Sequence, residues 1–192
     1  IVDGFTTNPS LMRLAGAKSY RAYSLKILKV CKKKPISFEV LADDPKEMLK
    51  QAYKINSWSN NVFVKIPFTN SKGKKNLKLI KKLSNNNIKL NVTSLFTYDQ
   101  VREVYRVLNK RTESYLSIFA GRIADTGVDP SITISRAVKL AKQTKKIKIL
   151  WASCREVYSI FTADKLKCHI ITVPYSLLSK FKLLGKNLNK YS

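Results

Sequence analysis

A lysine lies in the middle of an apolar run, where its side chain could act as a nucleophile. Lys65 is the charged residue of the segment VFVKIP (62–67). Burial disfavours a charged ammonium and so frees the neutral, nucleophilic form of an amine. The chemistry that suits such an amine is Schiff-base formation with a carbonyl compound. The alternative is a structural ion pair with Glu39 of the segment ISFEVL, and spacing favours both equally.

Further polar residues lie at the carboxyl ends of other apolar, strand-like runs. Glu39 is one run before Lys65, so the two side chains are expected on adjacent strands. From there Glu39 could hold a water that transfers a proton to the hydroxyl of Thr93. The residues of these ends and of the turns that follow them are Thr6, Thr7, Asn8, Glu39, Lys65, Asn91, Thr93, Ser117, Phe119, Arg122, Ser153 and Arg155.

Two arginines follow strand-like runs late in the chain and could bind a phosphate. Arg122 comes five residues after Ser117, and Arg155 comes two residues after Ser153. A guanidinium binds phosphate in a bidentate manner, and barrels commonly build a phosphate site from late loops and helix N-termini. The alternative is a pair of ordinary surface arginines.

The elements that must position these residues are short β-branched runs separated by helical patterns. The runs read as continuous apolar strands, which is typical of a buried parallel sheet. The predicted strands are Ile1–Thr7, Ile36–Leu41, Val62–Pro67, Ile88–Thr93, Tyr115–Phe119, Ile147–Ala152 and His169–Val173.

The helical patterns between these runs carry start signals. Asp44-Pro45 and Asp129-Pro130 each place an N-cap before a proline at the first helical position. Thr97 with Gln100 fits a capping box. An apolar stripe with lysines between its members predicts an amphipathic helix on Leu77, Leu79, Ile80 and Leu83.

Strict strand–helix alternation predicts either a (β/α)₈ barrel or a doubly wound sheet. The predicted strands start 22 to 35 residues apart, and no linker divides them. The six glycines never form the GxGxxG fingerprint of dinucleotide-binding folds. We therefore predict one α/β domain over residues 1–192, a (β/α)₈ TIM barrel whose first βα unit is absent from this chain.

Composition limits the classes of partner. The chain of 192 residues has 37 Lys+Arg against 12 Asp+Glu, a formal net charge of +25. Most of these charges are lysines in helical stretches, which we interpret as solvated outer faces; nucleic-acid binding is a distant alternative. No apolar run reaches the ~18 residues that span a bilayer.

The cysteines and the histidine offer no obvious metal site. Cys31, Cys154 and Cys168 have no CxxC spacing, so neither a disulfide framework nor a zinc site is expected, and free thiols suit a reducing cytoplasm. His169, the single histidine, begins an apolar run and is interpreted as structural.

Taken in order, the motifs resemble the transaldolase family, most closely its small bacterial members. They are DGFTTNPSL, ISFEV, VKIPFT, NVTSLF, SIFAGRIADTG and WASCRE, and the resemblance runs from Val2 to about Pro174. It implies a (β/α)₈ barrel, a class I Schiff-base mechanism, and neither a metal nor an organic cofactor.

The resemblance also implies roles for individual residues. Lys65 matches the Schiff-base lysine, while Glu39 and Thr93 match the pair that orders the catalytic water. Thr6 belongs to the TTNPS motif at the substrate end of its strand. Asparagines that hydrogen-bond substrate hydroxyls are matched by Asn8 and Asn91. The substrate- and phosphate-binding positions are matched by Ser117, Phe119, Arg122, Ser153 and Arg155.

The implied reaction transfers a dihydroxyacetone unit between sugar phosphates, as in the pentose phosphate pathway. Sedoheptulose 7-phosphate or fructose 6-phosphate would be the donor, and erythrose 4-phosphate or glyceraldehyde 3-phosphate the acceptor. The alternative is a fructose-6-phosphate aldolase, which releases free dihydroxyacetone. Those aldolases tend to carry Gln at the position of Glu39 and Tyr at that of Phe119, so both positions favour transfer.

The chain departs from the family pattern at its ends. The first strand of the family carries an Asp that acts as general acid/base, and Asp3 does not correspond to it. We expect the 192 residues to hold barrel strands 2 to 8, and this piece alone to be inactive or poorly folded. The full-length protein is expected to be a cytoplasmic homo-oligomer that acts on phosphorylated sugars, with no membrane or specific nucleic-acid partner.

Overall fold

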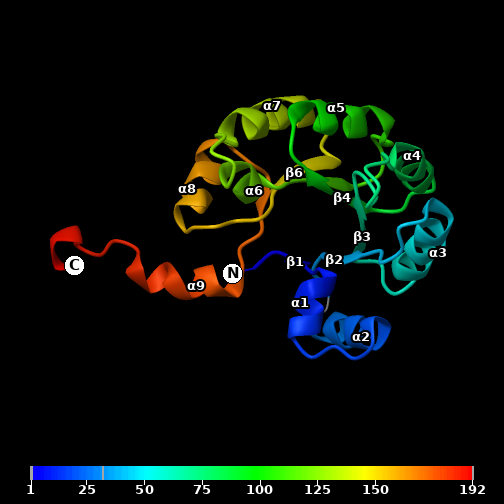
Figure 1. The fold of residues 1–192 in the computed structure, drawn as a ribbon, viewed down its shortest axis with the longest axis horizontal. Coiled ribbons are helices and arrows are strands. Elements are labelled where there is room, and N and C mark those ends of the chain that lie inside the picture. Colours follow the sequence, from blue (N-terminus) through cyan, green and yellow to red (C-terminus); the bar gives the residue numbers. More distant parts are fainter. Residues whose placement is uncertain (1, 32, 192) are drawn as a thin grey trace.

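The computed structural model describes residues 2–31 and 33–191. Within them, seven parallel strands form one sheet in chain order, and the sheet curls as part of a barrel (Figure 1). The strands are β1 (Phe5–Thr6), β2 (Ile36–Glu39), β3 (Val62–Pro67), β4 (Leu90–Leu95), β5 (Ser114–Ile118), β6 (Ile147–Trp151) and β7 (Ile170–Ile171). The predicted parallel sheet of sequential βα units is confirmed.

Helices connect successive strands and lie outside the curled sheet (Figure 1). The α-helices are α1 (Pro9–Leu14), α2 (Tyr20–Cys31), α3 (Pro45–Asn56), α4 (Leu77–Asn85), α5 (Tyr98–Val107), α6 (Ala120–Ala124), α7 (Ser131–Ala141), α8 (Tyr158–Lys165) and α9 (Tyr175–Leu178). Two 3₁₀ turns follow, η1 (Ser179–Leu183) and η2 (Leu188–Lys190). Among the described residues β1 and β7 are the sheet's edges, and no strand joins them. The architecture is that of a (β/α)₈ barrel with seven strands in place.

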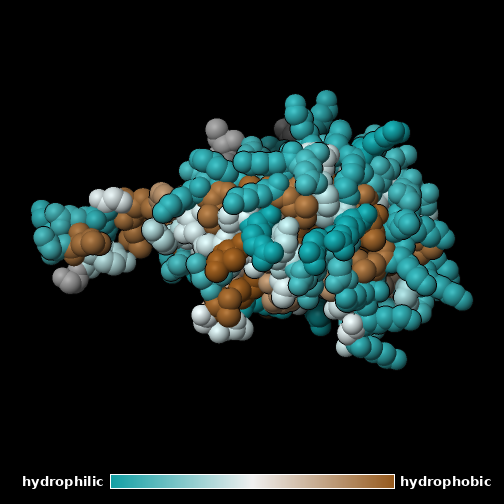
Figure 2. All heavy atoms as spheres, turned by 90° about the horizontal axis from the view of Figure 1, so that it is seen from above, coloured by the Kyte–Doolittle hydropathy of each residue, from teal (hydrophilic) through white to brown (hydrophobic). Residues whose placement is uncertain are grey.

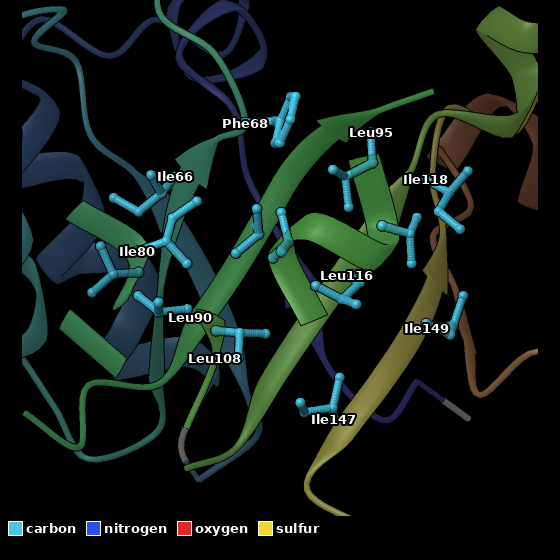
Figure 3. Packing of buried hydrophobic residues seen from close by; sticks show 14 of the residues in the cluster. Ile66, Phe68, Ile80, Leu90, Leu95, Leu108, Leu116, Ile118, Ile147 and Ile149 are labelled. Atoms are coloured by element: carbon cyan, nitrogen blue, oxygen red, sulfur yellow. The ribbon is translucent and has the colours of Figure 1, made fainter. Parts of the chain in front are cut away.

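The hydrophobic core lies between the outer face of the sheet and the helices. Figure 3 shows Ile66 and Leu90 of the strands beside Ile80 of α4, with Leu116 and Ile118 further along the sheet, and all five are fully buried. The predicted stripe of α4 is confirmed, because its Leu79, Ile80 and Leu83 side chains are buried. Since side chains alternate along a strand, the odd-numbered residues of β2 to β5 face the concave side, except Leu95, which follows an irregularity in β4 and lies in the core.

The lower part of that concave side is filled by aromatic rings. Phe63 of β3 stacks on Tyr115 of β5 with 4.1 Å between ring centroids and 13° between planes. The two strands are separated by β4, so this contact crosses the inside of the curl. The aromatic pair thus lies on the same face of the sheet as the polar residues of the strand ends, two residues before Lys65 and Ser117.

Two of the three helix-start predictions are confirmed, and one is wrong by one residue. Asp44 caps α3 with Pro45 at the first position, and Thr97 with Gln100 forms a capping box on α5. Helix α7, however, begins at Ser131 with Pro130 as its N-cap. Asp129 still serves this end, because its Oδ1 accepts a hydrogen bond of 2.8 Å from the Ser131 N–H.

The outer strands are shorter than predicted. The first spans Phe5–Thr6 in place of Ile1–Thr7, and Ile1 lies outside the described residues. The last spans Ile170–Ile171 in place of His169–Val173. Each of these strands pairs with one neighbour only, so fewer of its residues are held in ladder hydrogen bonds. β4 runs on to Leu95 because of an irregularity that also shapes the site.

His169 lies at this edge and has a structural contact. Its Nδ1 accepts a hydrogen bond of 3.2 Å from the Ile149 N–H. Burial lowers the pKa of the imidazole, and the charge of Lys148 lowers it further. An Nδ1 that accepts a hydrogen bond carries no proton, so the contact requires the neutral ring.

The stability of the chain should therefore fall between pH 7.5 and pH 5. The folded pKa of His169 lies below its unfolded value near ~6.5, so the unfolded state binds more protons as the pH falls. The stabilisation is complete above the unfolded pKa and is lost as the pH falls through the folded one. We expect less than ~1 kcal/mol, because the ring is partly exposed.

Urea unfolding of the wild type and of His169→Gln at both pH values measures the contribution of His169 to the free energy of unfolding. The variant should show a flatter pH dependence. The lowered pKa values of Asp43 and Asp129 lie below 3.8, outside this window. If the free energy of unfolding changed equally with pH in the two proteins, His169 would not be the cause of the pH dependence.

The segment after β7 leads away from the body of the protein (Figure 1). Tyr175 and Leu188 are 84% and 82% exposed, and Leu178, Phe181 and Leu184 are also exposed. In Figure 2 apolar residues lie along this projecting segment and where it leaves the body.

Candidate active site

Lys65 and Glu39 meet at the carboxyl ends of β3 and β2. The two residues are register partners, and Lys65 Nζ lies 3.2 Å from Glu39 Oε2. Their side chains are only 12% and 19% exposed. Lys65 Nζ also donates a hydrogen bond of 3.3 Å to the carbonyl oxygen of Thr7. The predicted adjacency is confirmed, and the pair lies at the rim of the curled sheet.

Thr93 ends the next strand and has a buried hydroxyl without a partner. Among the described residues, Oγ1 of Thr93 makes no hydrogen bond. The ladder between β4 and β5 is irregular between Val92 and Leu95, and Ser94 has a φ of 59°. Such bulges re-aim side chains and concentrate beside functional sites. The unused hydroxyl is available to a water or a ligand.

Replacing Thr93 by valine should leave stability unchanged while slowing turnover. Val has nearly the same shape, and an unpaired buried hydroxyl gives no net hydrogen bond to lose. We expect unfolding free energies within about 0.5 kcal/mol of wild type, and a rate of sugar transfer lower by ~10–10² if the hydroxyl relays a proton.

Thr112 offers the matched control for this change. Its buried hydroxyl donates a hydrogen bond of 3.0 Å to the Ser84 carbonyl, far from Lys65 in the fold. Thr112→Val should cost ~1–2 kcal/mol without altering the rate. A large stability loss in Thr93→Val, or an unchanged rate, would contradict the assignment. Urea unfolding and a coupled transfer assay measure both quantities.

Asn91 belongs to a buried chain of hydrogen bonds across the concave face. Ser117 donates to Asn91 Oδ1 at 2.6 Å, and Asn91 Nδ2 donates to the Ser37 hydroxyl at 3.0 Å. All three residues are 1% exposed. These two contacts use one of the two amide hydrogens of Asn91 and its side-chain oxygen. Ser37 was not predicted; its only signal is its position two residues before Glu39, on the same face of the strand.

The first strand contributes more through its backbone than through the predicted side chains. Thr6 is exposed, and Asn8 caps α1 by accepting a hydrogen bond of 2.8 Å from the Leu11 N–H. The amide nitrogen of Asn8 remains free of this contact. Thr7, between them, supplies the carbonyl that Lys65 contacts, and its hydroxyl donates to the Ser37 carbonyl at 2.8 Å.

The late strands bring together the residues predicted for phosphate binding. The guanidinium of Arg122 lies 5.0 Å from the centroid of the Phe119 ring, which meets Phe96 edge-on at 5.6 Å. Arg155 forms an exposed ion pair with Asp125, at 2.6 Å. The side chains of both arginines face solvent. Asp125 was not predicted; it keeps Arg155 beside the end of α6.

Gly121 makes this arrangement possible by close backbone approach. A Cβ at this position would lie 1.6 Å from the carbonyl oxygen of Ser153. Ser153 has a φ of 62°, so the chain turns sharply there, before Arg155. The start of α6 and the loop after β6 thus touch, which places Ser153 and Arg155 beside the helix that carries Arg122.

Comparison with known proteins supports the same class. The sequence matches the Transaldolase/Fructose-6-phosphate aldolase family over residues 1–191. It is similar to the "Probable transaldolase" of Methanococcus maripaludis strain C5, 34% identical over 183 residues, or 94% of this chain and 80% of that protein. The "Probable transaldolase" of Dehalococcoides mccartyi is 33% identical over 180 residues, 93% of this chain and 79% of its own length.

A third relative is the "Probable transaldolase 2" of Listeria monocytogenes, 34% identical over 183 residues, which are 94% of this chain and 78% of that protein. The chain belongs to the transaldolase/fructose-6-phosphate aldolase family. Membership implies an enzyme of the aldolase and transferase kind with phosphorylated sugars as substrates. No helix in the described part of the chain is both long and apolar enough to cross a membrane.

Proposed function

We propose that this protein is a transaldolase that transfers a dihydroxyacetone unit through a Schiff base on Lys65. The observation that carries the proposal is the Lys65 amine, largely shielded from solvent at the end of β3 and 3.2 Å from the Glu39 carboxylate. A carboxylate at this distance can take up the ammonium proton directly or through a water. The neutral amine is then the nucleophile.

In the proposed mechanism, the amine attacks the C2 carbonyl of sedoheptulose 7-phosphate or fructose 6-phosphate. The adduct loses water to give a protonated imine. This imine accepts the electron pair of the C3–C4 bond while the C4 hydroxyl gives its proton to the general acid/base Asp that the resemblance implies, so an aldose phosphate leaves and a neutral enamine remains on Lys65. The enamine attacks the aldehyde carbon of a second aldose phosphate, and water then releases the new ketose phosphate.

The remaining site residues receive supporting roles in this proposal. Glu39 and Thr93 hold the water that enters and leaves, since Thr93 has an unused hydroxyl beside the lysine strand. Asn91 and Ser117, fixed by their mutual hydrogen bond, together with Asn8 and Thr6, meet substrate hydroxyls. Arg122, Ser153 and Arg155 bind the phosphate, because α6 and the loop after β6 are in contact.

Phe119 favours transfer over simple cleavage. It has no hydroxyl, and its ring is covered by Phe96 and by the Arg122 guanidinium. An enamine beside it finds no phenolic proton donor at this position. The intermediate then waits for an aldehyde acceptor, which is the behaviour of a transaldolase and not of an enzyme that releases dihydroxyacetone.

Borohydride trapping tests the proposal. Incubation with fructose 6-phosphate and borohydride should reduce the imine to a stable secondary amine, and peptide mapping should find the adduct on Lys65. An adduct on another residue, or none in the full-length protein, would overturn it. Product analysis without an acceptor aldehyde separates the two activities, because a transaldolase releases little free dihydroxyacetone.

The wider setting is proposed on the same basis. We place the reaction in the pentose phosphate pathway of the cytoplasm, where the free thiols of Cys31, Cys154 and Cys168 suit reducing conditions. The exposed apolar side chains after β7 support a homo-oligomer of the full-length protein. The general acid/base Asp expected on a preceding strand stays a prediction.

A further inference from the structure

The hydroxyl of Tyr20 lies between the two backbone polar groups of Glu39. It donates a hydrogen bond of 2.8 Å to the Glu39 carbonyl and accepts one of 2.9 Å from the Glu39 N–H. Tyr20 is the first residue of α2, so this contact joins a helix to the strand that carries the carboxylate. One phenol thus satisfies both backbone groups of a predicted site residue.

This contact is needed because β1 ends before its ladder with β2 reaches Glu39. Thr7 N–H donates to the Ser37 carbonyl at 3.1 Å, and a regular parallel ladder would continue with a bond from Glu39 N–H to the Thr7 carbonyl. That carbonyl accepts from Lys65 Nζ instead, and at Asn8 the chain turns into α1. Without Tyr20, both backbone groups of Glu39 would lack the partner that the ladder normally supplies.

The Tyr20 ring is held by aromatic packing. It lies 6.3 Å from the ring of Trp58, which meets Phe38 edge-on at 5.5 Å. Burial, with a contribution from the Glu39 charge, raises the pKa of Tyr20 to about 12. The phenol therefore keeps its proton at any pH at which the enzyme works and can donate to the Glu39 carbonyl throughout.

We propose that Tyr20 is a positioning residue for the Lys65–Glu39 pair. It replaces the ladder partner of Glu39, fixes the backbone from which the carboxylate reaches the amine, and leaves the Thr7 carbonyl to Lys65. This role rests on the proposed function, because it matters for catalysis only if Lys65 is the nucleophile. It concerns a residue outside the strand ends where the site residues were predicted.

Tyr20→Phe tests this role, with Tyr23→Phe as the matched control. Tyr23 lies one turn further along α2 and is also partly buried. Loss of the Tyr20 hydroxyl should slow the formation of the borohydride-trapped adduct about tenfold, with KM for the donor within about twofold. A misplacement of ~1 Å at a reacting group can cost up to ~10² in rate. Tyr23→Phe should match wild type.

Two further measurements do not depend on turnover. Hydrogen exchange at the Glu39 amide should be slow in wild type and at least about tenfold faster in Tyr20→Phe, because the acceptor is gone. Acetic anhydride at a fixed pH should label Lys65 faster in Tyr20→Phe than in wild type, in the direction of Glu39→Gln, because the carboxylate is no longer held in an ion pair with the amine.

The outcomes separate this proposal from the proposed function. Unchanged adduct formation in Tyr20→Phe, an equal loss in Tyr23→Phe, or an unprotected Glu39 amide in wild type would each overturn the role of Tyr20. The last result decides the question even if the variant does not fold. Failure of wild type to form any adduct would sink the Schiff-base function instead, and the exchange and labelling data would still show whether Tyr20 holds Glu39.

Discussion

Replacing Lys65 by arginine or methionine should abolish the trapped adduct and lower the rate of sugar transfer by at least ~10³. Covalent catalysis depends on an amine that can lose its proton, and neither replacement has one. A guanidinium stays charged at every working pH because its pKa exceeds ~12. A thioether cannot attack a carbonyl to form an imine. Transfer assays and mass spectrometry of the borohydride-treated protein measure both effects.

The two variants also separate the catalytic and structural interpretations of Lys65. Arginine keeps a positive charge beside Glu39, whereas methionine leaves the carboxylate, with its side chain 19% exposed, without a cation. If the ion pair served stability alone, Lys65→Arg would retain the transfer activity of wild type. We expect it to fold and to be inactive, while Lys65→Met is the less stable of the two in urea.

Substitution of Gly121 by alanine should damage both the fold and the phosphate site. The added Cβ would lie 1.6 Å from the Ser153 carbonyl oxygen and 2.8 Å from Cγ of Arg155. Real Cβ atoms do not approach backbone oxygen so closely, so α6 or the loop after β6 must move. Overpacking of this kind costs ~1–3 kcal/mol, and the backbone neighbour places the cost at the upper end.

The kinetic consequence should fall on substrate binding. Displacement of the loop that carries Ser153 and Arg155 should raise KM for sugar phosphates about tenfold, since each charge-assisted contact contributes ~1.5–3 kcal/mol. Gly16→Ala is the control: its Cβ would meet nothing within 4 Å, although a φ of 81° adds a cost of ~1–2 kcal/mol. It should lower stability without changing KM. An unchanged KM in Gly121→Ala would contradict the proposed phosphate site.

Sequence patterns predicted the parts of this protein that follow from periodicity. Continuous apolar runs identify the strands, and helix-capping residues identify the starts of α3 and α5. The contact between Glu39 and Lys65 was predictable because parallel register places equivalent positions of neighbouring strands side by side.

Contacts between elements that are not neighbours in the sheet were beyond such reasoning. Tyr20 reaches Glu39 from a helix, and nothing in its spacing along α2 distinguishes it from Tyr23. The positive φ values of Ser94 and Ser153 have no residue signature, because non-glycine residues seldom adopt them. Asp125 lies at the end of α6 and reaches Arg155 because α6 packs against the loop after β6. Each depends on three-dimensional packing that periodicity does not encode.

The sequential strand order has a consequence for how the chain acquires its structure. Register partners lie from 20 residues apart, as for Leu150 and Ile170, to 33 apart, as for Ser114 and Ile147. Among the described strands, no pairing waits for a distant segment, so each of their loops is short and of similar length. During synthesis, the strands that carry Glu39, Lys65 and Thr93 can therefore pair while β6 is still in the ribosome, so the contact between Lys65 and Glu39 can form before the loop after β6 meets α6.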